Sequence, residues 1–330
     1  MEIALKTRPR SSQLRYLIDD SSKVGEARRA AQTLANFEFN AEIAGRVAIG
    51  ATELANNLLQ HAGSGELLIQ TLGADELAVV ELLAIDRGPG MADVTRCMTD
   101  GYSTAGTPGT GLGAVRRLAT EFDIHSAPGE GTVVMARFGT GMKLRYGAVS
   151  VALEGEIDCG DAWHIEQDAD GFSLLVVDGL GHGTFAAEAA HAAVAAFTAC
   201  PFATPQEIML RANGMMSKTR GGSAACARMA GDKLSYAGVG NISATLVSET
   251  RSQGLVSHNG TLGLNQRRSQ QFEYLRESGA LLIMHSDGVS ARWNLKNRSD
   301  LLARHPAIIA GAIYRDYTRK SDDATVVVVA

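Results

Sequence analysis

Apolar and polar residues alternate with two different periods along this chain. Residues 21–37 and 40–63 carry apolar side chains three and four positions apart, which predicts two amphipathic helices. The serine pair that opens the first of these runs is suited to cap it. Asn40 is suited to cap the second helix, and Gly63 is suited to end it.

Shorter β-rich runs follow these two helices. Residues 66–72 and 76–85 are joined by a link of hairpin length. A long glycine- and threonine-rich loop then leads to a predicted helix at 111–122 and a predicted strand at 131–138. The first part of the chain therefore reads as a layer of helices on a mixed sheet.

The rest of the chain is dominated by strands. Helices are predicted at 183–197 and 204–218, and strands at 148–155, 172–178, 223–230, 233–239, 243–248, 272–277, 280–287 and 324–330. Most of these strands follow one another by short links, which favours antiparallel sheets with helices packed outside. We therefore expect an α+β protein of two domains, 1–140 and 148–330, joined by a linker at 141–147.

Composition agrees with this division and excludes several classes of protein. A chain of 330 residues with 45% hydrophobic and 20% charged residues is typical of a soluble two-domain protein. Its net charge of -5 argues against nucleic acid as a partner. We also expect no membrane partner, because no apolar run has the length that crossing a bilayer requires. The four cysteines form no CxxC pair, so a reducing cytoplasm is the expected location.

The second predicted helix carries the first candidate chemistry. Glu53 and Asn57 are four residues apart and share one face of that helix. A carboxylate beside a carboxamide suits a site for magnesium and phosphate, because hard cations prefer oxygen ligands and an attacking hydroxyl can use a nearby base. Taken alone, the pair also fits a solvated helix face.

Glycines frame two further candidate positions. Asp86 ends a strand in "DRGPGM", where Gly88 and Gly90 allow a tight turn and the close approach of a ligand. A carboxylate there can accept a hydrogen bond from an exocyclic amine such as that of adenine. Further on, Gly109, Gly111 and Gly113 lead straight into a helix, whose free amides can hold phosphates. Each motif alone is weak, and Asp86 alone is only a turn residue.

The order and spacing of these motifs, together with "GEGTVVMARF", resemble the N, G1 and G2 boxes of the GHKL (Bergerat) ATP-binding fold, an α/β sandwich. Within that fold the chain resembles the anti-sigma serine kinase branch, and "GYST" before the glycine loop looks most like the switch kinases of stress-response signalling complexes. The resemblance implies ATP and Mg²⁺ as cofactors. Asn57 would hold Mg²⁺, Asp86 would bind adenine with Thr132 in support, and Glu53 would be the general base.

The same resemblance makes the glycines of both loops part of the nucleotide site, with Gly111 and Gly113 covering the phosphates. A histidine kinase is disfavoured, because no separate dimerisation helix with a phosphoacceptor histidine precedes the pocket. His61 lies near the motif, and a structural or surface role is favoured for it.

Aspartates recur in the second half wherever a predicted strand ends or turns. These are Asp161, Asp178, Asp287, Asp322 and Asp323. Any one of them is most simply a turn or cap residue. Brought together at one end of a sandwich they would repel one another unless cations neutralise them. Mg²⁺ or Mn²⁺ suits such oxygen ligands, and a pair of these ions suits the hydrolysis of a phosphate ester.

The landmarks "GD", "VVDGLGHG", "GGSAACA", "YAGVGN", "HNGTLGL", "LLIMHSDGV" and "SDDATVVVV" resemble the metal-dependent phosphatase 2C family, in its SpoIIE-like branch. The resemblance implies an αββα sandwich that binds two or more Mn²⁺ or Mg²⁺ ions. It assigns the metal ligands as Asp161, Asp178, Asp287, Asp322 and the carbonyl of Gly179, with Asp178 also catalytic.

Three other residues of this half lie outside the ligand set that the resemblance assigns. Asp323 follows a ligand position and would support the site from behind it. His164 stands where many relatives have an acidic residue, which puts an accessory metal or substrate contact in doubt. His182 has two open interpretations, orientation of water or substrate phosphate and plain loop packing.

The two resemblances together predict a bifunctional regulator of bacterial partner switching. It would phosphorylate and dephosphorylate Ser or Thr of STAS-domain or anti-sigma-antagonist proteins, and a sigma factor or a stressosome-like complex is a further candidate partner. The alternative is a phosphatase whose ATP-binding domain only captures a partner, and a scaffold with two inactive sites is disfavoured. The sequence does not define the oligomeric state.

Overall fold

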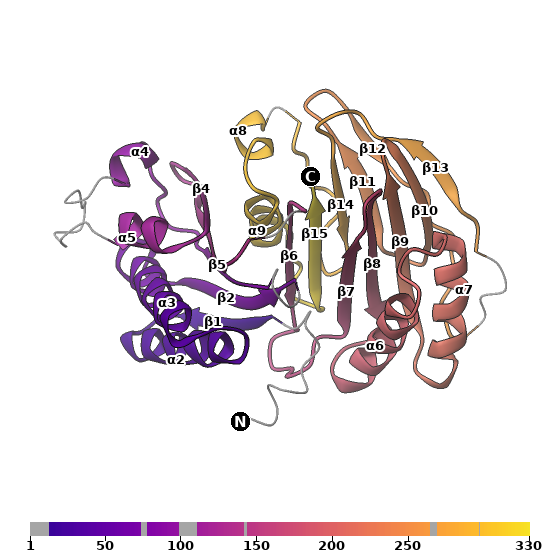
Figure 1. Ribbon diagram of the computed structural model, residues 1–330, viewed down its shortest axis with the longest axis horizontal. Coiled ribbons are helices and arrows are strands. Elements are labelled where there is room, and N and C mark those ends of the chain that lie inside the picture. Colours follow the sequence, from indigo (N-terminus) through magenta and orange to yellow (C-terminus); the bar gives the residue numbers. More distant parts are fainter. Residues whose placement is uncertain (1–12, 74–77, 99–110, 142–143, 265–268, 297) are drawn as a thin grey trace. The chain divides into compact units, whose positions relative to one another are not determined.

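The computed structural model of the chain describes residues 13–73, 78–98, 111–141, 144–264, 269–296 and 298–330. They divide into two compact units (Figure 1). Unit 1 contains Met1–Arg145 and Ala307–Arg315, and unit 2 contains Tyr146–Pro306 and Asp316–Ala330. The segment Ala307–Arg315 lies in unit 1, although the sequence reading placed it in the second domain.

Unit 1 is built on one antiparallel sheet with strand order β1-β2-β3-β5-β4. The strands are β1 (Leu14–Ile18), β2 (Gly65–Leu72), β3 (Val79–Ile85), β4 (Glu121–Ala127) and β5 (Gly131–Gly139). Its helices are α2 (Ser21–Glu38), α3 (Ala41–Ala62), α4 (Val94–Cys97) and α5 (Gly111–Leu118), together with most of α9 (Pro306–Tyr317). The predicted layer of helices on a sheet is confirmed, but the expectation of a mixed sheet is wrong, because every described strand pair of this sheet is antiparallel.

The ends of the first two helices follow local chemistry, with one correction. Asn40 caps α3 by accepting a hydrogen bond from the Ile43 amide, and Gly63 ends that helix with a left-handed φ of 76°. The prediction that the serine pair caps α2 is wrong. The cap is Asp20, whose carboxylate accepts a hydrogen bond from the Ser22 amide, so both serines lie inside the helix.

Two strands of unit 1 were not predicted. The helix expected at 111–122 ends at Leu118, and β4 begins at Glu121. The residues from Glu121 onward form a strand because they pair with β5. In this register Phe122 lies opposite Ala136. β1 pairs in the same way with β2. Both strands are at the edges of the sheet, where the sequence carries little of the period that marks a strand.

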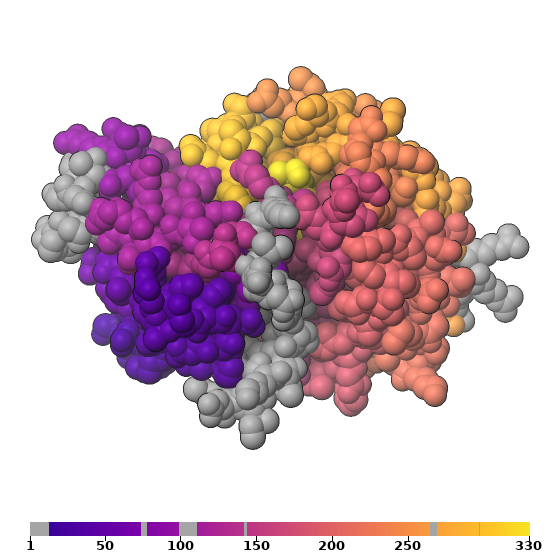
Figure 2. All heavy atoms as spheres, in the orientation of Figure 1, coloured from indigo at the N-terminus to yellow at the C-terminus, as the bar shows by residue number. Residues whose placement is uncertain are grey.

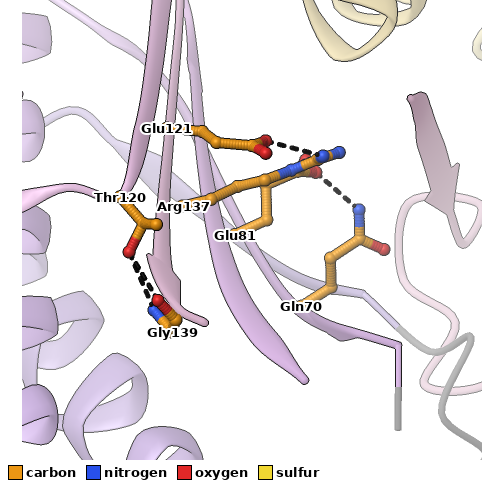
Figure 3. A network of polar contacts seen from close by, with 6 residues as sticks. All are labelled: Gln70, Glu81, Thr120, Glu121, Arg137 and Gly139. Carbon is orange, nitrogen blue, oxygen red and sulfur yellow. Dashed lines mark hydrogen bonds and ion pairs between the residues drawn. The ribbon is translucent and has the colours of Figure 1, made fainter. Parts of the chain in front are cut away.

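The two faces of this sheet are buried in different ways. On one face α2 and α3 pack alanines and leucines, including Ala31 and Leu54, against the strands. The other face carries a polar network (Figure 3). There the Arg137 guanidinium is 2.7 Å from a carboxylate oxygen of Glu81, and Gln70 donates to the other oxygen at 2.8 Å. Arg137 also pairs with Glu121 at 3.2 Å.

Unit 2 contains two five-stranded antiparallel sheets that face each other (Figure 1). One has the order β13-β10-β9-β8-β7 and the other β12-β11-β14-β15-β6. The strands are β6 (Tyr146–Val151), β7 (Asp161–Gln167), β8 (Gly171–Gly179), β9 (Gly222–Ala230), β10 (Lys233–Val239), β11 (Ser243–Val247), β12 (Ser252–Gly254), β13 (Phe272–Leu275), β14 (Leu281–His285) and β15 (Ala324–Val329).

Helices cover the outer face of the first of these sheets. α6 (Thr184–Thr198) packs on β7 and β8, and α7 (Pro205–Met215) packs on β9 and β10. The short η2 (Met216–Lys218) follows α7, and α8 (Ser299–Leu302) precedes α9. The outer surface of α6 and α7 is visible in Figure 2. The predicted antiparallel sheets with helices outside are therefore confirmed.

The long apolar runs of this half reflect burial on both faces of a strand. In β8, Leu175 and Val177 pack against the helix layer, whereas Leu174 and Val176 point to the opposite face and are equally buried. A strand buried on both sides loses the alternation of polar and apolar residues. Strand β7, β12 and the helices α8 and α9 were not among the predicted elements.

Candidate functional site

Glu53 and Asn57 on α3 lie against the start of α5. A β-carbon added to Gly111 would lie 2.9 Å from Oε2 of Glu53 and 3.4 Å from Oδ1 of Asn57. The amide nitrogen of Asn57 is buried and has no hydrogen-bond partner among the residues that the structure describes. A side chain at Gly111 would push the Glu53 carboxylate aside, so the glycine lets α5 begin close to Glu53, and Asn57 has an unused polar group at this point.

Asp86 leaves β3 as predicted and is held by backbone amides. Its carboxylate accepts hydrogen bonds from the amides of Gly88 at 2.8 Å and Thr132 at 3.1 Å. Burial raises the pKa of Asp86, and these two amides act in the opposite direction. The arrangement fixes the carboxylate while leaving room for a further donor such as an amine.

The loop after Asp86 is fastened to the turn between β4 and β5. Gly90 has a φ of +70°, and a β-carbon there would lie 2.0 Å from the carbonyl oxygen of Ala127. The Ser126 hydroxyl accepts a hydrogen bond from the amide of Met91 at 2.8 Å and lies 2.9 Å from the Thr132 hydroxyl. Thr132 thus lies beside Asp86. Ser126 was not predicted, because nothing in its sequence surroundings marks it.

The remaining predicted residues of this half are three glycines and one histidine. Gly88 is close to Ala62 at the end of α3, and Gly113 is buried within α5. Gly109 lies outside the described residues. His61 is exposed at the end of α3, and its positive charge would lower the pKa of Asp86.

In unit 2 the first two predicted aspartates are cross-strand neighbours. Asp161 on β7 pairs directly with Asp178 on β8, so the two side chains share one face of the sheet. Asp161 is buried and accepts a hydrogen bond from the Ser286 hydroxyl at 2.6 Å. Burial raises the pKa of Asp161 well above its usual value, and the charge of Asp178 acts in the same direction.

Asp178 lies in a strongly negative surrounding. Burial, and then the charges of Asp287 and Asp322, raise the pKa of Asp178 to about 7. A hydrogen bond from Asn241 acts on the Asp178 pKa in the opposite direction, and Asn241 also donates to Asp287 at 2.7 Å. Asn241 belongs to the "YAGVGN" landmark, but the sequence reading gave it no role.

Asp323 holds the approach to Asp161 in place. Its two carboxylate oxygens accept hydrogen bonds from the amides of Leu153 at 2.8 Å and Gly160 at 2.9 Å. Its side chain is therefore fully engaged with the backbone. The amide of Asp323 in turn donates to Asp322 at 2.9 Å, which orients that carboxylate.

Glycine is required beside Asp178. A β-carbon at Gly179 would lie 2.1 Å from the carbonyl oxygen of Ala186 in α6. The close approach of α6 leaves no room for a side chain, so the chain can turn here only with glycine. This is the position whose carbonyl the sequence reading assigned to metal.

The two histidines of this half that the sequence singled out, His164 and His182, have protein partners. His182 Nδ1 lies 2.6 Å from Glu156 Oε1, and its side chain is 54% exposed. His164 lies 2.9 Å from Glu166 and packs its ring edge on Phe197 of α6. His164 is therefore tied to the helix layer, and His182 to the loop before β7.

The donor set around Asp178 fits Mg²⁺ or Mn²⁺ by its chemistry. Every candidate ligand is an oxygen, and the mutual repulsion that raises the pKa of Asp178 is what a cation would relieve. In the described residues, however, no three His, Cys, Asp or Glu side chains are close enough together to form a ready-made metal site. The carboxylates of this set would have to move closer together to share an ion.

Comparisons with known proteins identify the first half. A family model described as the histidine kinase-like ATPase domain matches residues 19–138. The serine/threonine-protein kinase RsbT of Bacillus subtilis (strain 168) is 38% identical over 91 residues, which are 28% of this chain and 68% of RsbT.

The second half matches a different family. A model described as stage II sporulation protein E (SpoIIE) matches residues 168–330. A solved structure of RsbX in complex with magnesium is 21% identical, with a TM-score of 0.51 over 64% of this chain and 100% of RsbX. At this identity RsbX supports the fold alone.

A third comparison is with a solved structure described in terms of the bacterial stressosome. This structure, described as a modular system adapted to control secondary messenger signalling, is 30% identical. It has a TM-score of 0.53 and covers 57% of this chain and 100% of its own. Among the described helices, none has both the length and the apolar character that a membrane span requires. The chain belongs to the RsbT-like branch of the histidine kinase-like ATPase family, and its C-terminal part is a SpoIIE-type phosphatase 2C domain.

Proposed function

We propose that this chain is a bifunctional regulator of partner switching. Its first domain transfers phosphate from ATP to Ser or Thr of a STAS-domain or anti-sigma-antagonist protein, and its second domain removes that phosphate. The observation that carries the kinase half is the placing of Glu53 and Asn57 against Gly111 at the start of α5. A domain that only captured a partner would not need a carboxylate at that point.

Each residue of the nucleotide site has a distinct part in this proposal. Asp86 accepts a hydrogen bond from the adenine amine while the amides of Gly88 and Thr132 hold it. The start of α5 offers amides to the phosphates. Asn57 would hold Mg²⁺, which neutralises phosphate charge when bound. Glu53 accepts the proton of the attacking hydroxyl.

The glycines Gly88, Gly90, Gly109, Gly111 and Gly113 complete this nucleotide site in the proposal. Gly88 and Gly90 let the loop after Asp86 turn close to the base, and the other three cover the phosphates. The crowding at Gly90 and Gly111 supports their assignment, because a side chain at either place would meet a neighbour at 2.0 or 2.9 Å.

In the phosphatase site Asp161, Asp178, Asp287, Asp322 and the carbonyl of Gly179 would hold two or more Mn²⁺ or Mg²⁺ ions. When bound, these ions supply the activation of water and the neutralisation of the phosphate. The protein's own contribution is to position the carboxylates. Asp178 occupies the centre of the negative cluster, Asn241 fixes Asp287, and Ser286 fixes Asp161.

Radiolabelled ATP separates the two activities. The protein is incubated with ATP labelled on its γ-phosphate, Mg²⁺, Mn²⁺ and a candidate STAS-domain protein. Asp178→Asn should leave lasting label on the partner, because transfer continues and removal stops. Glu53→Gln should remove labelling while preserving hydrolysis of a phosphorylated partner. If Asp178→Asn binds ATP and partner but transfers no label, the first domain is a binding module instead.

A further inference from the structure

Helix α9 belongs to the phosphatase half by sequence and to unit 1 by packing. Its residues Ala307–Arg315 are part of unit 1, whereas Pro306 and the residues from Asp316 onward are part of unit 2. Residues 306–315 of the helix are all buried, and even Arg315 is only 4% exposed. A helix that is apolar on all sides is a core element rather than a surface connection.

The packing of α9 reaches the strand ends that carry the nucleotide residues. A β-carbon added to Gly311 would lie 2.9 Å from Cγ1 of Val133 and 3.5 Å from Cδ1 of Ile85. These two residues directly adjoin Thr132 and Asp86 (Figure 1 draws α9 beside β5).

Two polar residues of α9 extend this contact. One turn of helix after Gly311, the Tyr314 hydroxyl donates to Glu66 on β2 at 2.8 Å. Burial raises the pKa of the Asp86 carboxyl, and the positive charge of Arg315 acts in the opposite direction. The last turns of α9 are thus fixed to the nucleotide-binding unit by both apolar and polar contacts.

The residues at the end of α9 hold the loop of a candidate metal ligand. The amide of Ser290 donates to the carbonyl of Tyr317, the last residue of α9, at 2.9 Å. Two residues further on, the amide of Arg319 donates to the carbonyl of Gly288 at 2.8 Å. Gly288 directly follows Asp287, so the backbone after α9 is paired with the loop that presents this carboxylate.

We propose that α9 couples nucleotide binding in the first domain to the metal-binding loop of the phosphatase. This inference rests on the proposed function, since it assumes that Asp86 belongs to a nucleotide site and Asp287 to a metal site. A nucleotide that orders the ends of β3 and β5 also orders α9, and α9 restrains the Asp287 loop. A loop that is already ordered loses less entropy when a metal binds, so the two ligands should favour each other.

The first experiment measures metal dependence with and without nucleotide. The rate at which the whole protein hydrolyses p-nitrophenyl phosphate is measured over a series of free Mn²⁺ concentrations set by a metal buffer. Each series is run without and with a saturating non-hydrolysable ATP analogue. We expect the analogue to lower the half-saturating Mn²⁺ concentration by about fivefold, the lower end of common coupling. Hydrogen exchange should slow at the Ser290 and Arg319 amides.

Variants of α9 test whether the helix carries the coupling. Gly311→Val inserts a side chain against Val133 and should reduce the shift in Mn²⁺ dependence to less than twofold. Gly45→Val is the matched control, because Gly45 also lies in a helix of unit 1 but its β-carbon would meet nothing within 4 Å. It should keep the full shift. If Gly311→Val does not fold, Tyr314→Phe removes the hydroxyl that donates to Glu66 and should weaken the shift.

Calorimetry of nucleotide binding separates the two proposals. If the analogue binds but neither the Mn²⁺ dependence nor the exchange of Ser290 changes, the coupling is refuted and the proposed function stands. An equal shift in wild type and Gly311→Val also refutes it, because α9 would then not be the link. Failure of the analogue to bind overturns both proposals. A shift without phosphate transfer supports the coupling and rejects the kinase.

Discussion

Burial and the charges of its neighbours together set the charge state of Asp178. Because its pKa is raised to about 7, the folded protein binds this proton more tightly than the unfolded chain does. The stabilising effect of the bound proton is present at low pH and is lost as the pH rises through about 7. In the metal-free protein, the ionised Asp178 therefore destabilises the fold at pH 8.

Asp178→Asn should stabilise the metal-free protein at pH 8 by roughly 1–2 kcal/mol and by less at pH 5, because it removes this repulsion. The same variant should lose the stabilisation that Mn²⁺ gives the wild type. Urea unfolding at both pH values, with and without Mn²⁺, measures both effects. Asp232→Asn, at an exposed turn, is the control. Equal stabilisation of the variant and the wild type by Mn²⁺ would show that Asp178 is no ligand.

The ion pair of Arg137 and Glu81 is a second effect at the level of single residues. Both side chains are almost completely buried, at 1% and 0% exposure. Arg137→Met would leave the buried Glu81 without its ion-pair partner, so we expect a loss of about 3–5 kcal/mol in the free energy of unfolding. Arg46→Met breaks an exposed pair with Glu42 and should cost less than about 1 kcal/mol. Urea unfolding compares the two, and similar losses would contradict the assigned role of burial.

Among the connections between elements, the loop after β3 is the most constrained in the nucleotide site. Gly90 and Gly129 both have positive φ angles, of +70° and +79°, but only a β-carbon at Gly90 would meet the backbone of Ala127. Gly90→Ala should therefore displace the loop and lower nucleotide affinity by about tenfold or more, equal to about 1.4 kcal/mol.

Gly129→Ala is the matched control for this loop. It carries the same backbone strain, of roughly 1–2 kcal/mol, without the contact. We expect it to reduce stability modestly and to leave nucleotide affinity nearly unchanged. Titration calorimetry with an ATP analogue measures the affinities. A similar loss in both variants would mean that backbone strain, not the fastening of the loop, determines binding.

Considered as a whole, the molecule has a first unit that is not continuous in sequence. A fragment of residues 1–145 lacks α9 and should expose the apolar surface formed by Leu83, Ile85 and Val133. We expect this fragment to bind a hydrophobic dye and to melt at a lower temperature than the same unit in the whole chain. Circular dichroism and dye fluorescence measure both properties.

A peptide of residues 304–318 should raise the melting temperature of that fragment when added in excess, because it binds the folded form. The same peptide with Gly311→Val should have a much smaller effect. A fragment that melts like the unit in the whole chain and ignores the peptide would rule out this role of α9.

The sequence by itself determined the helices α2, α3, α6 and α7, the central strands and both sets of candidate residues. The helical periods of 21–37 and 40–63 and the glycine-flanked aspartates are local features, and local features can be read from a single chain. The comparisons support the two families that these motifs indicated. The edge strands β1 and β4 could not be read in this way, because pairing with a neighbour rather than an intrinsic period makes them strands.

Only the tertiary structure decided where distant residues meet. The place of α9 in unit 1 depends on Gly311 fitting against Val133, a contact between segments far apart in the sequence. The pairing of Asn241 with Asp287 and the capture of Asp323 by the amides of Leu153 and Gly160 are of the same kind. Such contacts depend on shape and register across the fold, which no local period of the sequence encodes.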